Sequence, residues 1–418
     1  MARQPRHTLA ARIVARLDRL ASITSTPGEV TRLYLTKEHR EAANVVAGWM
    51  SEAGLAVCQD AAGTVIGRVE GTASGAKTLF VGSHIDTVRN AGRFDGGLGV
   101  VAAIEAMAEL RRLDIRLPFA VEVLAFGDEE GVRFPSTLTT SRAIAGTLDA
   151  TVLHVCDGDG VTLRDALVAY GCDPARLAEC ARDPVTVLGF IEIHIEQGPV
   201  LEAEELPIGV VTAISGASRF CVDVTGKAGH AGTVPMPQRR DALTGAAEMV
   251  LAVERTARDT AGLVATVGQI AAVPGTVNVV AGGATFTLDV RSPVDGTRRR
   301  GFQQLDREFR AIARRRHLSV SLEETYDEKS VVCDQRFIRH LTAAAEALGQ
   351  PAFGMPSGAG HDGLAMVKLC PIGMLFVRCK GGVSHQPEES VKAEDMEIAT
   401  RTLMDFLQRV SSTGRTIA

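Results

Sequence analysis

Aromatic residues are scarce in this chain, and it has no long apolar run. Its 418 residues include one Trp and three Tyr, and aromatic residues make up 4% of the total, which favours a polar pocket. No apolar run reaches the roughly 20 residues that a transmembrane helix needs. The net charge of −5 gives no reason to expect nucleic acid, and the three arginines at 298–300 are typical of a solvated helix face. We therefore expect neither a membrane nor nucleic acid among its partners.

The eight cysteines form no C-x-x-C pair. In a chain of this length they are typical of scattered, mostly buried thiols in a reducing compartment, and we predict a cytoplasmic protein. The first 12 residues are basic and amphipathic, which is also a feature of transit peptides. Asp18 and the continuous helical pattern around it favour a first helix instead.

Length and pattern predict two domains. A chain of 418 residues exceeds the usual size of one hydrophobic core. Up to about residue 126, helical and strand patterns alternate, which is typical of an α/β fold with a mixed or parallel sheet covered on both faces. Near residue 212 the pattern becomes β-α-β-β-α-β-like, which is typical of a ferredoxin-like unit. Its strands are expected at 218–226, 263–270, 284–290 and 318–322, and its helices at 239–257 and 296–315. We predict a catalytic domain over 1–211 and 330–418, with an insert over 212–329.

Four segments place His or a carboxylate where a strand pattern meets a loop. They are Gly82–Asp86, Arg93–Gly96, Glu129–Glu130 and Glu192–Gly198. Binding sites in α/β sheets lie beyond the carboxyl ends of the strands, so we expect the four segments to converge. Any one of them could arise by chance, but the four together predict a single metal centre.

His84 and Asp86 are two residues apart, so on a strand their side chains face the same side. A histidine that binds metal usually donates its second ring N–H to a carboxylate, and Asp86 is the candidate for that role. Taken alone, the pair is better explained as a buried histidine and a helix-capping aspartate.

Asp95 precedes two glycines and a helical pattern. A carboxylate in this position can bridge two divalent ions, although in isolation an N-cap is the better explanation. The string Gly97–Ala102 also matches the dinucleotide-binding pattern, with Glu122 about 20 residues further on. The preceding strand pattern ends near residue 86, so the tight strand-to-glycine turn is missing. A nucleotide-dependent oxidoreductase is therefore disfavoured.

Glu129 and Glu130 follow the strand pattern 119–126. They point in different directions if the chain is extended, so one can bind a metal while the other holds an attacking water. A general base must lie within one hydrogen bond of that water, and a metal-bound water becomes a good nucleophile near neutral pH. An acidic surface loop would explain an isolated Asp-Glu-Glu string.

His194 and His385 complete the candidate set. His194 opens the string His-Ile-Glu-Gln-Gly, and His385 lies in a Gly/Ser loop after a strand pattern. A lone loop histidine is usually solvent-exposed, but imidazole together with carboxylates suits Zn, Mn, Co or Ni. The number and mixed N/O character of the donors predict a two-ion site. Its metal ligands would be His84, Asp95, Glu130, His194 and His385.

The segments together resemble the hydantoinase/carbamoylase amidase branch of the M20 metallopeptidase superfamily. Its members include N-carbamoyl-L-amino acid hydrolases, allantoate amidohydrolases and β-ureidopropionases. The resemblance covers nearly the whole chain. It rests on Gly82–Thr87, Phe94–Gly96, Glu129–Phe134, His194–Gly198, Gly229–Met236, Thr276–Val280, Asp289–Arg291, Ser357–Asp362 and Ser384–His385. It implies a mixed-sheet, metallo-exopeptidase-like catalytic domain interrupted by an α+β lid and dimerisation domain.

The resemblance also implies roles for individual residues. Two divalent ions would be held by the five ligands, with Asp95 as the bridge and Glu129 as the base. The chain would form a homodimer in which His230 reaches the active site of the partner subunit.

The lid is expected to supply groups that hold the substrate. Arg291 can hold an α-carboxylate through two hydrogen bonds. His230 and Asn278 are preorganised donors for an oxyanion, and Gln197 can read a ureido group through its amide. The other predicted substrate contacts are Ser357, Gly358 and His361.

We expect hydrolysis of a linear ureido or amide C–N bond in a small substrate that carries a carboxylate. Allantoate and an N-carbamoyl-L-amino acid are the leading substrates, and the low aromatic content leans toward allantoate. An M20-type dipeptidase or aminoacylase is the alternative, which the set of Gln197, Asn278 and Arg291 argues against. A non-catalytic metal-binding relative would be expected to lack Glu129 or one of the ligands, and all are present.

Overall fold

The computed structural model describes residues 8–413 and contains two compact units. The first unit comprises the chain up to Thr212 together with Cys333–Met355 and the chain from Ala359. The second comprises Ala213–Val332 and Pro356–Gly358. The first seven residues of the basic N-terminal segment lie outside the described residues. Within residues 8–413, no helix has the length and apolar character needed to cross a membrane.

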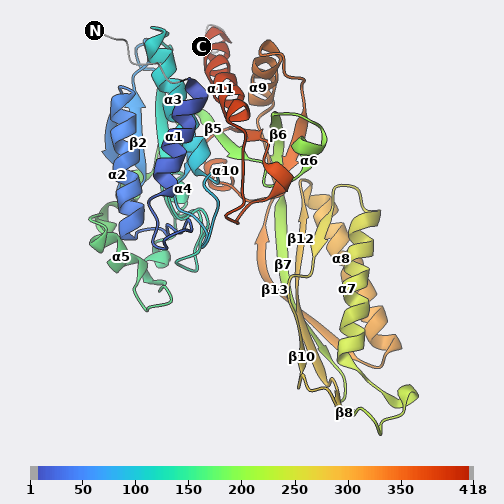
Figure 1. Ribbon diagram of the computed structural model, residues 1–418. Helices are drawn as coiled ribbons and strands as arrows, with labels where there is room; N and C mark the ends of the chain where they lie inside the picture. Colours follow the sequence, from blue (N-terminus) through green and yellow to red (C-terminus); the bar gives the residue numbers. More distant parts are fainter. Residues whose placement is uncertain (1–7, 414–418) are drawn as a thin grey trace. The chain divides into compact units, whose positions relative to one another are not determined.

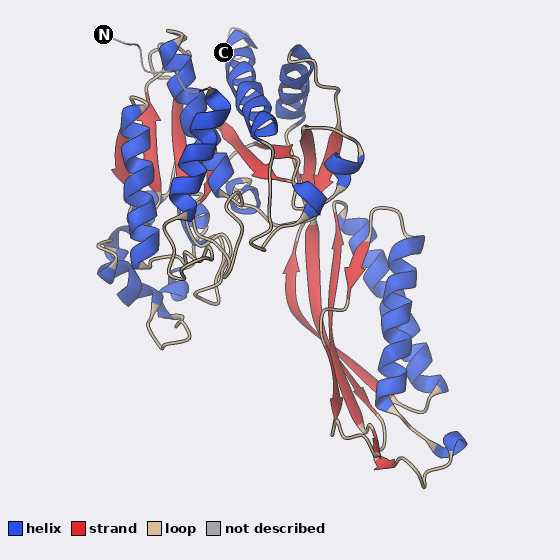
Figure 2. Ribbon diagram, in the orientation of Figure 1, coloured by secondary structure: helices blue, strands red, loops and turns tan. Residues whose placement is uncertain are grey.

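A mixed nine-stranded sheet is built largely from the first unit (Figures 1 and 2). Its strand order is β1-β2-β4-β3-β5-β16-β6-β14, and β15 pairs with β6. The strands are β1 Ala56–Gln59, β2 Val65–Val69, β3 Thr78–His84, β4 Ala120–Phe126, β5 Val187–Ile195, β6 Ile208–Ile214, β14 Val331–Val332, β15 Gly354–Ser357 and β16 Ile372–Val377. The four neighbours β4, β3, β5 and β16 run parallel. Their carboxyl ends therefore lie at one edge, which is where sites form in such sheets.

One face of this sheet is covered by long helices. The helices of the first unit are α1 Leu9–Ala21, α2 Lys37–Glu52, α3 Gly97–Arg112, α4 Thr139–Ile144, α5 Leu163–Ala169, α6 Val200–Ala203, α9 Gln335–Ala347, α10 Gly363–Met366 and α11 Ala393–Thr413. Short 3-10 helices lie at Ala150–His154, Pro174–Cys180, Pro184–Thr186 and Lys380–Gly382. Residues of α1, α2, α3, α9 and α11 join the inward side chains of the strands in one apolar core.

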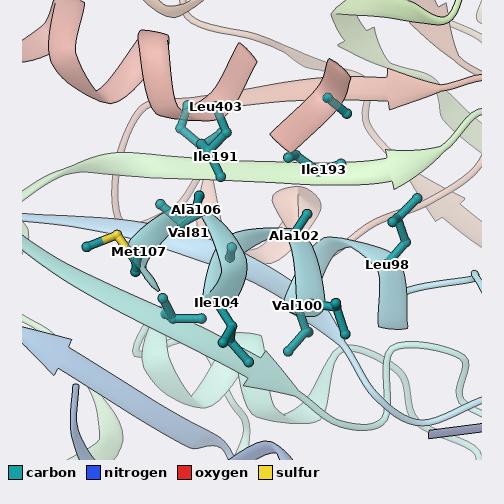
Figure 3. Packing of buried hydrophobic residues seen from close by; sticks show 14 of the residues in the cluster. Val81, Leu98, Val100, Ala102, Ile104, Ala106, Met107, Ile191, Ile193 and Leu403 are labelled. Atoms are coloured by element: carbon teal, nitrogen blue, oxygen red, sulfur yellow. The ribbon is translucent and has the colours of Figure 1, made fainter. Parts of the chain in front are cut away.

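Helix α3 lies at the centre of that core (Figure 3). It is apolar nearly all round and contacts α1, α11, β3 and β5, as expected for a helix buried on every side. Burying each Leu, Ile or Val side chain contributes about 1.5–3 kcal/mol. The one deeply buried charge on its inner turns, Glu105, pairs with Arg12 and Arg16 of α1. Because the core packing fixes helix α3, the loop before it, which carries Asp95, is held at the carboxyl ends of the strands.

The second unit is an α+β unit (Figure 1). Its five-stranded antiparallel sheet has the order β10-β12-β7-β13, with β9 on β12. Its elements are β7 Gly216–Thr225, β8 Gly229–His230, 3-10 helix Met236–Gln238, α7 Ala242–Asp259, β9 Val264–Thr266, β10 Ile270–Val273, β11 Val279–Val280, β12 Gly283–Ser292, α8 Asp295–Arg315 and β13 Ser319–Glu328. Helices α7 and α8 pack on alternate strand residues such as Phe286, Leu288 and Val290. The opposite face keeps polar residues, including Asp289 and Arg291.

Most elements expected from sequence lie within three residues of the observed bounds. The prediction of one strand over 263–270 is wrong, because the structure has two short strands there, Val264–Thr266 and Ile270–Val273. Between them the Gln269 carbonyl still accepts from Thr287 N–H (3.1 Å), but Gln269 N–H donates to the Thr287 hydroxyl (3.1 Å). The side chain of a neighbouring strand therefore satisfies the backbone group that a continuous strand would have paired.

A buried histidine, His39, lies beneath the loop that follows β4. Its Nδ1 is 2.8 Å from the Tyr170 hydroxyl, and its Nε2 has no hydrogen-bond partner among the described residues. Its ring packs edge-on against Tyr34 at 5.5 Å between centroids. Burial, reinforced by nearby Arg32, Arg40 and Arg133, lowers the pKa of His39 to about 3. His39 is therefore neutral in the folded protein at neutral pH.

The buried His39 should make the fold sensitive to acid. Below pH 6.5 the unfolded chain binds a proton at this position that the folded chain does not, so stability is lost as pH falls from 6.5 toward 3. By pH 5 the loss amounts to about 2 kcal/mol. We expect His39→Gln to reduce the pH dependence of urea unfolding between pH 7 and pH 5 by about that amount. The exposed His154→Gln is the control, and an equal pH dependence in all three proteins would contradict the prediction.

Candidate metal centre

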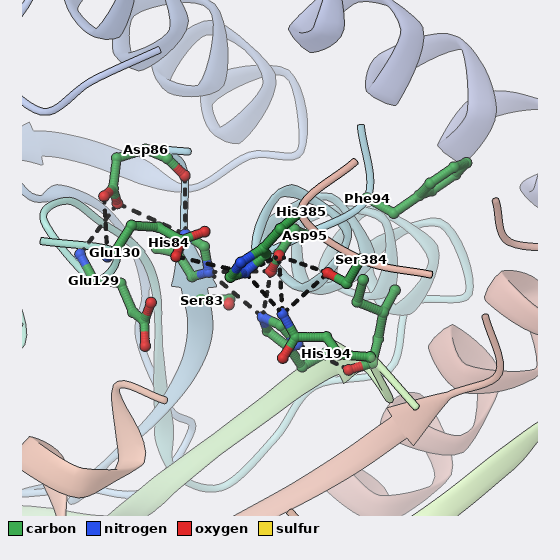
Figure 4. A network of polar contacts seen from close by, with 12 residues as sticks. Ser83, His84, Asp86, Phe94, Asp95, Glu129, Glu130, His194, Ser384 and His385 are labelled. Atoms are coloured by element: carbon green, nitrogen blue, oxygen red, sulfur yellow. Dashed lines mark hydrogen bonds and ion pairs between the residues drawn. The ribbon is translucent and has the colours of Figure 1, made fainter. Parts of the chain in front are cut away.

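Histidines and carboxylates converge at the carboxyl ends of the four parallel strands (Figure 4). His84 is the last residue of β3 and lies level with Phe126 at the end of β4. His194 is the penultimate residue of β5. The other members come from loops: Asp95 precedes α3, Glu129 and Glu130 follow β4, and His385 follows β16. All of them belong to the first unit.

Asp95 is the centre of this arrangement, and its two carboxylate oxygens face different partners. Oδ1 lies 3.0 Å from His194 Nε2 and 3.7 Å from His84 Nε2. Oδ2 lies 3.2 Å from His385 Nε2, and the same His385 nitrogen is 3.7 Å from Glu130 Oε2. One carboxylate therefore separates two sets of donors.

The donor atoms form two groups that meet at Asp95. In each group, one ligand atom per residue lies within 4.8 Å of the others: His84, Asp95 and His194 form the first, and Asp95, Glu130 and His385 the second. Glu129 lies beside them, because it forms a group of the same size with His84 and Glu130. The five predicted ligands and the predicted base are thus brought together, and their roles stay predictions.

Backbone carbonyls orient two of the histidine rings. His84 Nδ1 is 3.0 Å from the carbonyl oxygen of Asp86, and His194 Nδ1 is 2.9 Å from that of Ile195. A carbonyl oxygen only accepts, so each Nδ1 must carry a proton. Both Nε2 atoms face Asp95. Each Nε2 is therefore the nitrogen that could bind a cation once it has lost its own proton.

The Asp86 carboxylate was expected to accept a hydrogen bond from the His84 ring, and the structure shows a different contact. Its carboxylate is 3.7 Å from His84 Nδ1, beyond a hydrogen bond. It accepts instead from the backbone N–H groups of Glu129 and Glu130, each at 3.3 Å. The reason is local: the Asp86 backbone carbonyl already occupies the ring nitrogen. The side chain of Asp86 therefore holds the turn that carries the two glutamates.

Asp95 does not cap helix α3. The N-cap residue is Gly96, with φ 63°, and no side chain caps the helix. A side chain at position 96 would also overlap the His84 ring, so glycine is required there by both backbone and packing. The Asp95 carboxylate is thereby left to face the histidines.

The electrostatics of the group fit divalent cations. Burial opposes ionisation of Asp95, but hydrogen bonds from the His194, His385 and His84 rings hold its pKa well below the usual range. Desolvation and the nearby Asp95 raise the pKa of Glu130 to about 7. Desolvation, with Glu130 and Asp362 nearby, raises the pKa of Glu129 well above its ordinary value.

Crowded carboxylates of this kind require compensating positive charge. In addition, Glu130 Oε1 is buried without a hydrogen-bond partner within residues 8–413. Imidazole nitrogens and carboxylate oxygens in this ratio suit Zn, Mn, Co or Ni, so the residues present fit the predicted metal.

Two predicted substrate contacts belong to the first unit. Gln197, whose backbone has φ 59°, donates its amide to Asp95 Oδ2 (2.9 Å) and to the Ser384 hydroxyl (3.2 Å). His361 is buried, and its ring lies 4.5 Å from that of His194 and 5.7 Å from that of Phe376. Gln197 thus lies at the ligands, whereas His361 packs behind them.

The other predicted contacts belong to the second unit. His230 pairs with Val279, and the carbonyl of Asn278 accepts from Ala231 N–H (2.9 Å), so His230 and Asn278 are neighbours. Arg291 forms a bidentate pair with Asp289 (2.7 and 3.0 Å).

The same arginine joins β12 to the short segment that holds the last two predicted contacts. Arg291 Nη1 donates to the carbonyl of Gly358 (2.8 Å). Ser357 is buried, and its carbonyl accepts from Ser215 N–H (2.9 Å). Asp289 and Gly358 thus occupy part of the Arg291 guanidinium.

Sequence reasoning missed three buried acids near the ligands. Glu192 accepts from the Ser83 hydroxyl (2.8 Å) and precedes His194 by two residues on β5, so its side chain faces the same side. That spacing was an available signal. Asp362 is buried, and desolvation together with nearby Glu192 raises its pKa. Glu389 accepts a hydrogen bond from Asp95 N–H, 294 residues earlier in the chain. No local sequence pattern near either residue predicts that contact.

Comparison with known proteins identifies relatives of the whole chain. Residues 80–409 match the family described as Peptidase family M20/M25/M40. An N-carbamoyl-L-amino acid amidohydrolase from Geobacillus stearothermophilus is 41% identical over 393 residues, which is 94% of this chain and 96% of the relative. An allantoate deiminase from Arabidopsis thaliana is 39% identical, covering 94% of this chain and 81% of the relative.

A solved structure agrees with this assignment. An amidase of the hydantoinase/carbamoylase family from Burkholderia multivorans has a TM-score of 0.90 and 34% identity, covering 96% of this chain and 98% of that one. The expected mixed α/β fold is thereby confirmed. The chain belongs to the M20 peptidase superfamily and, within it, to the hydantoinase/carbamoylase amidase branch.

Proposed function

We propose that this protein is an amidohydrolase with two divalent cations, which cleaves a linear ureido or amide C–N bond in a small substrate that carries a carboxylate. The observation that carries the proposal is the division of the Asp95 oxygens between two donor groups. A single carboxylate shared in this way suits two adjacent ions. Cations bound there would polarise the scissile carbonyl and lower the pKa of an attacking water.

The side chains around the ligands supply the remaining chemistry. Glu129 lies beside His84 and Glu130 without belonging to either donor group at Asp95. Its position beside the donor groups suits a base that takes a proton from water and passes it to the leaving nitrogen. Asp86 holds the backbone of this turn, so the carboxylate keeps its position through the reaction.

The second unit is proposed to recognise the substrate. Arg291 would bind the carboxylate, and the neighbouring His230 and Asn278 would donate to the oxyanion. Gln197 would read the ureido group from the ligand side. We further propose that the second unit acts as a lid and as the interface of a homodimer, in which His230 serves the partner subunit. The predicted cytoplasmic location also stays a prediction.

The choice of substrate is the direct test. After chelation and dialysis, the protein should release ammonia from allantoate or from N-carbamoyl-L-amino acids only once Mn²⁺ is restored. The relatives carry both substrate names, so the two classes are assayed side by side with dipeptides and N-acetylamino acids. Hydrolysis confined to the last two would favour the dipeptidase or aminoacylase alternative and overturn the proposal.

A further inference from the structure

Glu389 connects two loops that carry metal-ligand candidates. Its side chain is 3% exposed. Oε1 accepts from the backbone N–H groups of Phe94 (2.8 Å) and Asp95 (3.2 Å), and Oε2 accepts from the Ser384 hydroxyl (3.1 Å). The first loop lies almost 300 residues before Glu389 and the second lies directly before it. One buried carboxylate thus joins the turn of Asp95 to the turn of His385.

The contacts in the first loop define the backbone position of Asp95. Two buried N–H groups without an acceptor would be unfavourable, so the turn is held where Glu389 can satisfy both. Gly92 begins the same turn, and a side chain there would overlap the Glu389 carboxylate. The backbone therefore packs directly on the carboxylate, and a movement of Glu389 would move Asp95.

The contacts in the second loop reach only one of the two donor groups. The Ser384 hydroxyl lies 3.1 Å from Glu389 Oε2 and also 3.1 Å from Asp95 Oδ2 (Figure 4 shows Ser384 beside Asp95 and His385). Oδ2 is the oxygen that faces His385, whereas Oδ1 faces the other two histidines. His385 has φ 56°, a conformation that a non-glycine residue keeps only when its surroundings hold it there.

We propose that Glu389 is a positioning residue for one cation position, the one formed by Asp95, Glu130 and His385, and that Ser384 transmits its effect. The inference rests on the proposed two-cation function. Glu389 hydrogen-bonds backbone groups of Phe94 and Asp95 and the Ser384 hydroxyl, so it acts by fixing the two loops. The position formed by Asp95 Oδ1, His84 and His194 needs no contact with Glu389.

Glu389→Gln is the sharpest test. The amide keeps one oxygen as an acceptor for the two backbone N–H groups, but its NH₂ group cannot accept from Ser384 and the charge is lost. Calorimetric titration of the chelated, dialysed protein with Mn²⁺ should show one affinity weakened about 10–100-fold, the usual effect of removing a group that orients a ligand. The other affinity should change less than about threefold. Ser384→Ala should weaken the same position, because it removes the hydroxyl that lies between Glu389 Oε2 and Asp95 Oδ2.

Glu105→Gln is the matched control. It removes an equally buried carboxylate, on α3, whose partners are Arg12 and Arg16 rather than ligand loops. It should leave both Mn²⁺ affinities unchanged even if it lowers the thermal unfolding temperature of the metal-free protein. In Glu389→Gln, by contrast, that temperature should change little while one Mn²⁺ affinity falls.

The outcomes separate this inference from the proposed function. If the unmodified protein binds fewer than two Mn²⁺ ions, the proposed function fails and the inference fails with it. If it binds two, and Glu389→Gln weakens both equally or neither, only the inference is overturned. Weakening of one position in both Glu389→Gln and Glu105→Gln would also overturn it, because a general loss of stability would then explain the effect.

Discussion

Replacing Glu129 with glutamine should remove hydrolysis while leaving the metal content intact. Glutamine has nearly the same shape but cannot take a proton, so a base at this position is lost without a change in packing. A general base contributes about 10²–10⁴-fold to the rate, and we expect kcat to fall about 10³-fold. Because Glu129 stands outside the two donor groups at Asp95, bound metal should stay at the level of the unmodified protein. Initial rates of ammonia release and metal analysis of the same sample measure both quantities.

Two comparisons make the Glu129 result interpretable. Glu346→Gln changes an exposed glutamate on α9 and should leave both rate and metal content unchanged. Glu130→Gln removes a candidate ligand, so it should lower metal content together with the rate. Activity within tenfold of the unmodified enzyme in Glu129→Gln would show that another group takes the proton. Loss of metal from Glu129→Gln would instead make this residue a ligand.

Replacing Asp95 with asparagine should lower metal content and activity together. The amide keeps one oxygen, but its nitrogen cannot act as a ligand and the negative charge is lost. Because Oδ1 and Oδ2 face different histidines (3.0 Å to His194 and 3.2 Å to His385), no orientation of the amide serves both positions. We expect less than one tightly bound ion per chain and a fall in kcat/KM of at least about 10³-fold, since a metal ion supplies several kcal/mol of transition-state stabilisation.

The number of ions bound by single histidine variants is the comparison for Asp95→Asn. Of the two donor groups that meet at Asp95, His194→Ala removes a ligand from the first and His385→Ala from the second. Each should therefore retain one ion, which metal analysis after gel filtration would detect. If Asp95→Asn retains two ions, or if it behaves like His385→Ala, the carboxylate does not bridge two positions and the arrangement proposed for the site is wrong.

Most of the ligand candidates could be found in the sequence because they lie next to a strongly patterned segment. The run 119–126 is entirely apolar apart from Glu122, and Ala120–Phe126 forms a fully buried strand that ends three residues before Glu129. The glycine that follows Asp95 marks a backbone that only glycine adopts easily, at φ 63°. At these points the apolar pattern predicts where a strand or helix ends, and a residue able to bind metal lies next to that end. The position of the residue can therefore be predicted from sequence alone.

Other features of the site depend on contacts between distant segments. Asp86 was expected to orient His84, but its carboxylate bonds the glutamate turn 43 and 44 residues away. Glu389 satisfies backbone groups of Phe94 and Asp95 across 295 and 294 residues. A hydrogen bond between two distant residues produces no periodic pattern in the sequence around either of them. Sequence reasoning therefore places such residues in loops and cannot assign their partners.

The order of the residues alone determined that this chain has an α/β sheet with polar donors at its strand ends, because burial imposes a period on apolar residues and glycine marks turns. Which oxygen of Asp95 faces which histidine was decided only by the tertiary structure. Strands β4, β3, β5 and β16 had to lie side by side, in that order and in register, before donors up to 301 residues apart in the chain could share one carboxylate. Distances between side chains are properties of packing, and a one-dimensional pattern does not contain them.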